Sequence, residues 1–158
     1  MVLRKAKLED FEVYKKLYED TEGSFQFLYF PNKNNTVSES INFFVDESIM
    51  ELYTNYTLDK FQKDLNSSLI IFMIEDNDKI LGYISLFYCG NYTYKIAEWA
   101  MLNPNNNEKK KLILQLLKKS TLPRLRKFSI CTVNNNTIEF LLSNGFKNSS
   151  STFYYLEI

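Results

Sequence analysis

The sequence has no histidine, so carboxylates, tyrosines and lysines are the side chains left for acid–base chemistry. This absence excludes Ser-His and Cys-His nucleophile pairs and histidine-containing zinc sites, and it removes the commonest general base. One carboxylate is the single charge in an alternating set of an expected strand, formed by Ile96, Glu98, Ala100 and Leu102. Apolar surroundings would raise the pKa of Glu98 towards a catalytically useful value. Solvent exposure of Glu98, or its pairing with Lys95 or Arg126, is the alternative.

The elements that would position this carboxylate lie between Asp78 and Ser120. Residues 79–88 and 92–102 are rich in β-branched and aromatic side chains and are separated by a Gly-Asn turn, which predicts a hairpin. Pro104 and a run of asparagines end the second strand, after which leucine and isoleucine recur at helical spacing. A helix that begins beside the end of a strand presents free N–H groups there, and these form an anion site.

Three lysines, Lys109, Lys110 and Lys111, occupy the first turn of that expected helix. The helix dipole disfavours cations there by about 0.3–1 kcal/mol each unless an anion is present. Side chains lean toward the N-terminus of a helix, so the three ammonium groups would lie over the loop. Two interpretations stay open: phosphate binding, or a solvated face near an acidic neighbour such as Glu108.

The remaining segments predict an α+β domain, because strands follow helices at the start of the chain while antiparallel hairpins fill its middle. Further strands are expected at residues 2–6, 68–75, 127–133 and 151–158. Further helices are expected at residues 8–22, 40–53, 57–65 and 137–143. Thr57 is the expected N-cap of the third of these helices, and a tight Asn77-Asp78 turn would make a second hairpin.

An aromatic segment between residues 24 and 57 precedes these elements and includes Phe27, Tyr29 and Phe30. Loops carried on a rigid scaffold tend to bind ligands, so these side chains could form the wall of a substrate site. The alternative is that they simply cover the core.

Composition limits the class of protein. With 158 residues, 45% of them hydrophobic, the chain is expected to be a single domain, 1–158. Lysine plus arginine equals aspartate plus glutamate at 19 each, which argues against a nucleic-acid partner. The longest apolar runs are too short to span a bilayer and no signal pattern opens the sequence, so we expect a cytoplasmic protein without a membrane partner.

Cys89 and Cys131 are expected to be buried thiols.

The order of these elements resembles the GNAT superfamily of acyl-CoA-dependent N-acetyltransferases over nearly the whole chain. Three stretches carry the likeness: LRKAKLEDF at the start, KILGYISL in the hairpin and CTVNNNTIEFLLSNGF near the end. The last is similar to the family segment Asn-x-x-Ala-x-x-x-Tyr-x-x-x-Gly-Phe, with Asn134, Gly145 and Phe146 in register. The resemblance implies a mixed, mostly antiparallel sheet flanked by helices, with an acyl-CoA site at a strand-loop-helix junction.

The pyrophosphate loop departs from the family pattern Gln/Arg-x-x-Gly-x-Gly/Ala. The matching residues here are Asn107, Glu108, Lys109, Lys110, Lys111 and Leu112. Lys110 and Leu112 stand at the two glycine positions, where glycine allows backbone N–H groups to approach phosphate closely. Losing two such hydrogen bonds would cost about 3–6 kcal/mol, or roughly a hundred- to ten-thousandfold in affinity.

The resemblance implies transfer of an acetyl group from acetyl-CoA to a primary amine of a small molecule or protein, without a metal. Backbone N–H groups of Met101 and Leu102 would polarise the thioester, and Glu98 would be the base. The family's usual tyrosine falls at Leu141, so Tyr154 or Tyr155 could protonate the leaving thiolate. The alternatives are that both tyrosines are packing residues and that water supplies the proton. A catalytically inactive GNAT-like binding module is the alternative. The acceptor amine and the oligomeric state stay open, and a homodimer is allowed.

Overall fold

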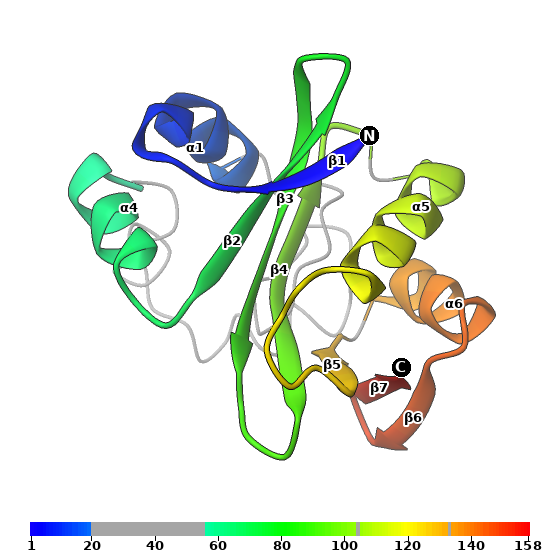
Figure 1. Ribbon diagram of the computed structural model, residues 1–158. Coiled ribbons are helices and arrows are strands. Elements are labelled where there is room, and N and C mark those ends of the chain that lie inside the picture. Colours follow the sequence, from blue (N-terminus) through cyan, green and yellow to red (C-terminus); the bar gives the residue numbers. More distant parts are fainter. Residues whose placement is uncertain (20–55, 104, 133) are drawn as a thin grey trace, which may run out of the picture.

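The computed structural model describes residues 1–19, 56–103, 105–132 and 134–158 (Figure 1). Within these segments seven strands form one sheet in the order β1-β2-β3-β4-β5-β7-β6. Neighbouring strands are antiparallel except β4 and β5, which are parallel. The strands are β1 (Val2–Lys5), β2 (Ile70–Asp76), β3 (Lys79–Tyr88), β4 (Thr93–Met101), β5 (Lys127–Cys131), β6 (Lys147–Ser150) and β7 (Phe153–Glu157). The expected α+β class with a mostly antiparallel sheet is therefore confirmed.

Helices cover both faces of the sheet (Figure 1). A 3-10 turn η1 (Leu8–Asp10), α1 (Phe11–Glu19) and α4 (Leu58–Leu65) lie on one face, and α5 (Asn107–Lys118) and α6 (Asn135–Ser143) lie on the other. Side-chain caps fix three of the helix starts: Thr57, Asn106 and Asn134 accept hydrogen bonds from backbone amides three residues later, at 3.2, 3.0 and 3.0 Å. The cap predicted at Thr57 is confirmed.

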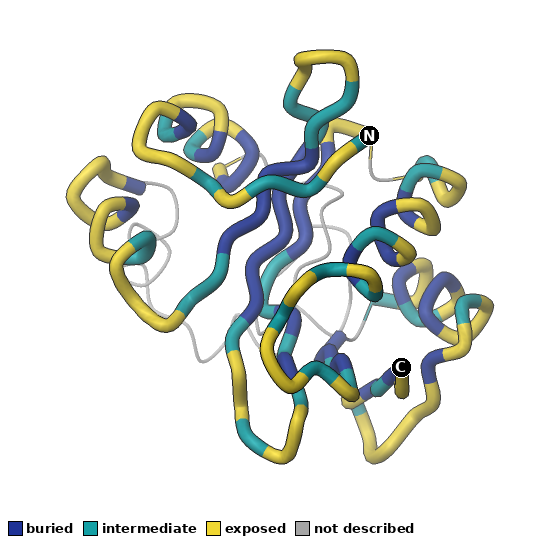
Figure 2. The backbone as a smooth tube through the Cα atoms, in the orientation of Figure 1, coloured by how far each residue is buried: buried dark blue, intermediate teal, exposed yellow. Residues whose placement is uncertain are grey.

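Each face of the sheet has its own apolar core, and the most deeply buried chain lies between the helix layers (Figure 2). The core under α5 and α6 contains Ile96, Trp99 and Met101 of β4. The core under α1 and α4 contains Tyr83 of β3 and Ala100 of β4. Side chains of β4 therefore serve both cores, and their position along the strand decides which face each one joins.

A β-bulge in β4 interrupts the regular alternation of side chains between the two faces of the sheet. Ile96 is paired with Leu86 of β3 and Glu98 with the preceding residue, Ser85, so Ala97 is the extra residue of the bulge. The register shift places Ile96 and Glu98 on opposite faces, whereas the sequence analysis expected them to share one. The parallel pairing with β5 also ends at this point, at Ile96 and Ile130. Beyond the bulge, β4 and β5 diverge.

Most expected elements are present, with differences at their ends. Asn77 and Asp78 both have positive φ, which confirms the predicted tight turn. The expected final strand at residues 151–158 is present as β7, but the strand Lys147–Ser150, which pairs with β7, was not predicted. The expected helix at residues 40–53 lies outside the described residues. Both cysteines are free, but Cys89 is exposed, contrary to expectation.

Within the described segments, no helix has both the length and the apolar character needed to cross a membrane.

Candidate active site

Glu98 lies on the α1 and α4 face, immediately after the bulge, and is half-buried. Its Oε2 atom accepts a hydrogen bond of 3.0 Å from the Tyr83 hydroxyl, and Tyr83 itself is buried. Burial raises the pKa of Glu98 to about 7, and hydrogen bonding from Tyr83 and Tyr14 partly opposes this rise. The expected raised pKa is therefore present, although the buried neighbours are tyrosines. Neither Lys95 nor Arg126 forms the salt bridge that the alternative required.

A cavity of about 450 Å³ opens beside this carboxylate, between α1, α4 and strands β3 and β4. Its floor is formed by Ser85, Ala97 and Glu98. Tyrosine side chains form much of its wall: Tyr14, Tyr18 and Tyr56. The volume falls within the range typical of small-molecule sites.

Charged groups of α4 lie at the same cavity. Asp64 accepts a hydrogen bond from the Tyr56 hydroxyl and forms a salt bridge of 3.0 Å with Lys60. The side chain of Lys60 is 60% exposed, so this charge lies toward solvent while Glu98 lies deeper. Asp64 is therefore compensated by its neighbours, whereas no salt bridge to Glu98 is formed by the residues described.

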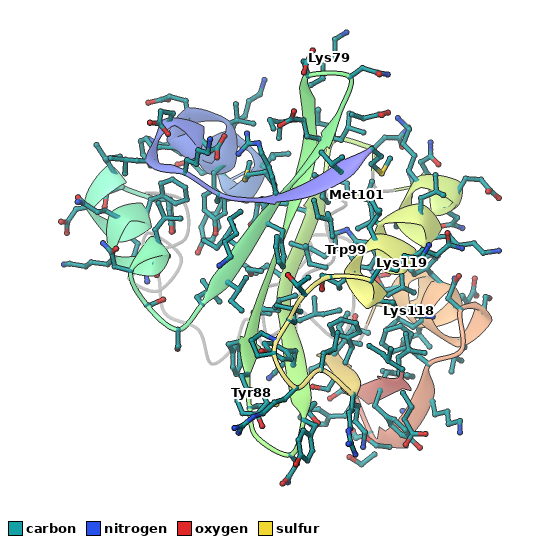
Figure 3. The ribbon with its side chains drawn as sticks, viewed as in Figure 1. Lys79, Tyr88, Trp99, Met101, Lys118 and Lys119 are labelled. Carbon is teal, nitrogen blue, oxygen red and sulfur yellow. The ribbon has the colours of Figure 1, made fainter. Side chains whose placement is uncertain are left out.

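The diverging edge of β4 presents backbone amides. The Leu102 amide donates to the Leu81 carbonyl at 2.8 Å, so it faces β3 and cannot polarise a substrate there; the expectation for Leu102 is wrong. Successive amides of a strand point to opposite sides, so the Met101 amide faces the gap beyond the last β4–β5 pair. Figure 3 shows Trp99 and Met101 on the part of β4 that lies beside α5.

Most backbone amides at the start of α5 already donate hydrogen bonds within the protein. Asn106 and Asn107 donate to backbone carbonyls of the preceding loop at 3.3 and 3.0 Å, and Lys109 donates to the Asn106 side chain at 3.0 Å. Among the amides of residues 106–109, only that of Glu108 forms no hydrogen bond within the described part of the chain. An anion bound here would displace the Asn106 side chain from the Lys109 amide, or it would accept a hydrogen bond from the Glu108 amide.

The three lysines of α5 have separate surroundings, contrary to the expectation that all lie over the loop. Lys109 extends toward Asp76, with Nζ 3.9 Å from the carboxylate. Lys110 is 5% exposed and its Nζ lies 4.6 Å from the centre of the Phe140 ring, and burial lowers its pKa. Lys111 is exposed, as is Leu112 at the second glycine position.

A second cavity, of about 500 Å³, lies between α5 and α6. Its lining includes Asn107, Glu108, Lys110 and Lys111 from the predicted loop. Phe140 of α6 contributes the opposite wall. The structure thus brings four of the six expected loop residues to one hollow on the face of the sheet away from Glu98.

The remaining expected site residues have different positions. Asn134 caps α6 through its side-chain oxygen, which accepts from Thr137 at 3.0 Å. Tyr154 is buried in the core under α5 and α6, so it lies on the opposite face from Glu98. Phe27, Tyr29 and Phe30 lie outside the described residues.

The cavity residues on β3 were missed by sequence reasoning, as was the role of the α1 tyrosine. The sequence does not distinguish Tyr14 from a core residue of its helix, and the alternation of β3 gives no reason to select Tyr83. A polar Ser85 between apolar Ile84 and Leu86 was the signal available, because such a hydroxyl needs a partner when buried.

Sequence comparison finds no matching family model and no matching curated protein. Structure comparison, in contrast, finds many matching chains. The PaiA N-acetyltransferase from Thermoplasma acidophilum in complex with coenzyme A has 15% identity and a TM-score of 0.64, covering 99% of this chain and 98% of that one. The spermidine N-acetyltransferase from Vibrio cholerae in complex with CoA and spermine has 14% identity and a TM-score of 0.66, covering 99% and 94%. The ribosomal-protein-alanine N-acetyltransferase from Brucella melitensis has 12% identity and a TM-score of 0.59, covering all of both chains.

These matches extend over nearly the whole of each chain, and they define a class: the chain has the fold of the GNAT N-acetyltransferases. The predicted resemblance is confirmed at the level of fold, and the low identity agrees with the altered pyrophosphate loop.

Proposed function

We propose that this protein transfers an acetyl group from acetyl-CoA to a primary amine. The observation that carries the proposal is the position of Glu98, a carboxylate with a pKa of about 7 at the floor of a cavity, next to the bulge where β4 separates from β5. A base with a pKa near the working pH combines a useful fraction of the charged form with enough basicity to accept a proton.

The donor would bind on the opposite side of the strand gap. The start of α5 and the cavity between α5 and α6 supply polar and cationic groups for the diphosphate, with Lys110 and Lys111 at the cavity wall. The side chain at the second glycine position, Leu112, is 50% exposed and turns away from the core, so it leaves this hollow open. Asn107, Glu108 and Lys109 complete the proposed loop contacts, and Asn134 lies at the start of α6.

Chemistry would take place at the gap between β4 and β5, with the donor bound on one face of the sheet and the acceptor on the other. Glu98 accepts a proton from the acceptor ammonium, and the free amine attacks the thioester carbonyl. The Met101 amide faces the gap and can stabilise the oxyanion that forms. The attack forms the carbon–nitrogen bond. Collapse of the tetrahedral intermediate then restores the carbonyl and breaks the bond from carbon to sulfur, while the nitrogen loses its second proton to water. The thiolate leaves with a pKa of about 8.5, so it needs little help; Tyr154, on the donor face, is the proposed proton source, with water as the alternative.

Isothermal titration with acetyl-CoA tests the donor site directly. We expect binding with a dissociation constant below about 100 μM. An absence of heat at millimolar acetyl-CoA would contradict the proposal and favour a GNAT-fold binding module.

Glu98→Gln tests the catalytic role separately from donor binding. We expect an unchanged dissociation constant for acetyl-CoA and a turnover reduced by about 10²–10⁴, because glutamine keeps the shape but cannot accept the proton. Release of the CoA thiol, followed over a panel of amines, is the measurement. Unchanged turnover would remove Glu98 from the mechanism.

A further inference from the structure

On the basis of the proposed function, we propose that the cavity beside Glu98 selects a small amine with one positive charge and an aromatic or apolar body. The ammonium group of this amine would contact Glu98 and Ser85. This assigns the acceptor class and gives Ser85 a substrate-binding role. Three features support this assignment: a Ser85 hydroxyl that has no hydrogen-bond partner among the described residues, the tyrosine wall and the distribution of charge around the cavity.

The proposed binding position of the ammonium group, called the seat below, is formed by two residues that face each other on neighbouring strands. Ser85 of β3 lies directly opposite Glu98 of β4, and both line the cavity floor. The Ser85 side chain is 1% exposed and its Oγ has no hydrogen-bond partner among the described residues. Buried hydroxyls are normally paired, so this oxygen is suited to accept a hydrogen bond from a ligand. A primary ammonium has three N–H donors, enough to reach both the Ser85 hydroxyl and the Glu98 carboxylate.

Tyrosine rings pack against one another beside this seat, and three of them line the cavity. The ring centres of Tyr14 and Tyr56 are 5.3 Å apart, those of Tyr18 and Tyr56 are 4.5 Å apart, and Tyr14 lies 4.3 Å from Tyr83. Tyrosine faces attract a cation and pack against apolar or aromatic groups. The wall therefore favours a ligand whose body is a ring or a short hydrocarbon chain.

The charges around the cavity favour a single ammonium group. Asp64 is already compensated by Tyr56 and Lys60, which leaves Glu98 as the uncompensated carboxylate of the described lining. A second ammonium group on the same ligand would approach Lys60, whose charge repels it. A linear polyamine is thus disfavoured relative to a monoamine of similar length.

Calorimetric titration of the 158-residue protein with 2-phenylethylamine, without acetyl-CoA, measures this seat independently of the donor site. We expect measurable binding of 2-phenylethylamine and weaker binding of spermidine. Ser85→Ala should weaken 2-phenylethylamine binding about tenfold, the effect of losing a hydrogen bond to a charged group, while acetyl-CoA binding is unchanged. Equal binding by wild type and Ser85→Ala would overturn the assigned seat.

Lys60→Ala tests the selection against a second charge, with Lys63→Ala as the matched control. Lys63 lies on the same helix and pairs with the exposed Asp59 at 2.9 Å, away from the cavity lining. We expect Lys60→Ala to raise spermidine affinity relative to 2-phenylethylamine about two- to fivefold, the range of one charge pair near a protein surface, and Lys63→Ala to leave the ratio unchanged. The same change in both variants, or in neither, would overturn the charge argument.

The outcomes separate this inference from the proposed function. If acetyl-CoA binds and spermidine is acetylated with a higher kcat/KM than 2-phenylethylamine, the acceptor class is overturned while the transferase survives. If 2-phenylethylamine binds through Ser85 but acetyl-CoA gives no heat, the proposed transfer reaction fails while the amine site stands.

Discussion

Glu98 draws its chemical character from the tyrosines around it. Tyr83 donates to its carboxylate at 3.0 Å, and burial raises the pKa of both Tyr83 and Tyr14 well above the ordinary value for tyrosine. These phenols therefore stay protonated through the neutral range and remain hydrogen-bond donors. Glu98 itself, with a pKa of about 7, is the cavity group that changes charge near neutral pH.

A pH profile should show this titration. In the protonated form Glu98 cannot accept the ammonium proton, so we expect kcat/KM to rise with pH through an inflection near 7. Glu98→Gln should lose that inflection and keep only the rise due to deprotonation of the amine substrate. Initial rates between pH 5.5 and 9 provide the measurement. A wild-type profile that matches the Glu98→Gln profile in shape would contradict the role of this carboxylate.

At the scale of elements, the α5 helix is the least conventional part of the proposed donor site. Its Asn106 cap occupies the Lys109 amide, and a buried lysine stands where the family pattern has glycine. The Lys110 ammonium is held 4.6 Å from the Phe140 ring at the wall of the cavity between α5 and α6. Such a cation can replace the missing amide contacts by pairing directly with phosphate.

The variant Lys110→Ala tests whether the lysine side chain replaces the missing contacts between backbone amides and phosphate. We expect acetyl-CoA affinity to fall about tenfold and to depend less steeply on salt, because one charge-assisted contact is lost. Lys118→Ala, at the other end of the same helix, is the control and should bind as wild type (Figure 3). Calorimetry at two salt concentrations gives both quantities. Tighter binding by Lys110→Ala would mean that the lysine obstructs the site.

The pairing of β3 with β4 depends on a glycine. A Cβ atom on Gly82 would lie 2.1 Å from the Ala100 carbonyl oxygen, which is backbone and cannot move aside cheaply. We expect Gly82→Ala to lower the free energy of unfolding by about 2–3 kcal/mol. Gly90→Ala, where the new methyl meets nothing within 4 Å but φ is +89°, should cost about 1 kcal/mol. Denaturant unfolding of both variants makes the comparison, and equal losses would contradict the close approach.

Across the whole molecule, periodicity was enough to predict the α+β class and most of the described elements, but not the strand β6 (Lys147–Ser150). Helix caps such as Thr57 and the Asn77-Asp78 turn were predictable because their chemistry is local. The bulge at Ala97 was not, because it depends on pairing with β3 and leaves no mark on the local alternation. That one residue reverses the face of Glu98 relative to Ile96.

The residues of the candidate site likewise divide into those that the local sequence identifies and those that depend on contacts between strands. Glu98 and the first turn of α5 were selected from residue type and position, and the structure places them beside cavities on opposite faces of the sheet. The contacts of Ser85 and Tyr83 could not be predicted, because Ser85 is the partner of Glu98 in the β3–β4 pairing and Tyr83 donates to the Glu98 carboxylate from β3. Tertiary neighbours, which the sequence does not specify locally, decide this part of the site.

The proposed function has the donor bound on one face of the sheet and the acceptor on the other, with the reaction where β4 and β5 diverge. A crystal of the protein soaked with acetyl-CoA tests this most directly. We expect the pantetheine arm between β4 and β5 beyond Ile96, the thioester oxygen near the Met101 amide, and the diphosphate at the start of α5 with the Asn106 side chain displaced or shared. A structure in which acetyl-CoA is absent from that gap, while Asn106 still caps α5 and Lys110 still lies on Phe140, would contradict the account.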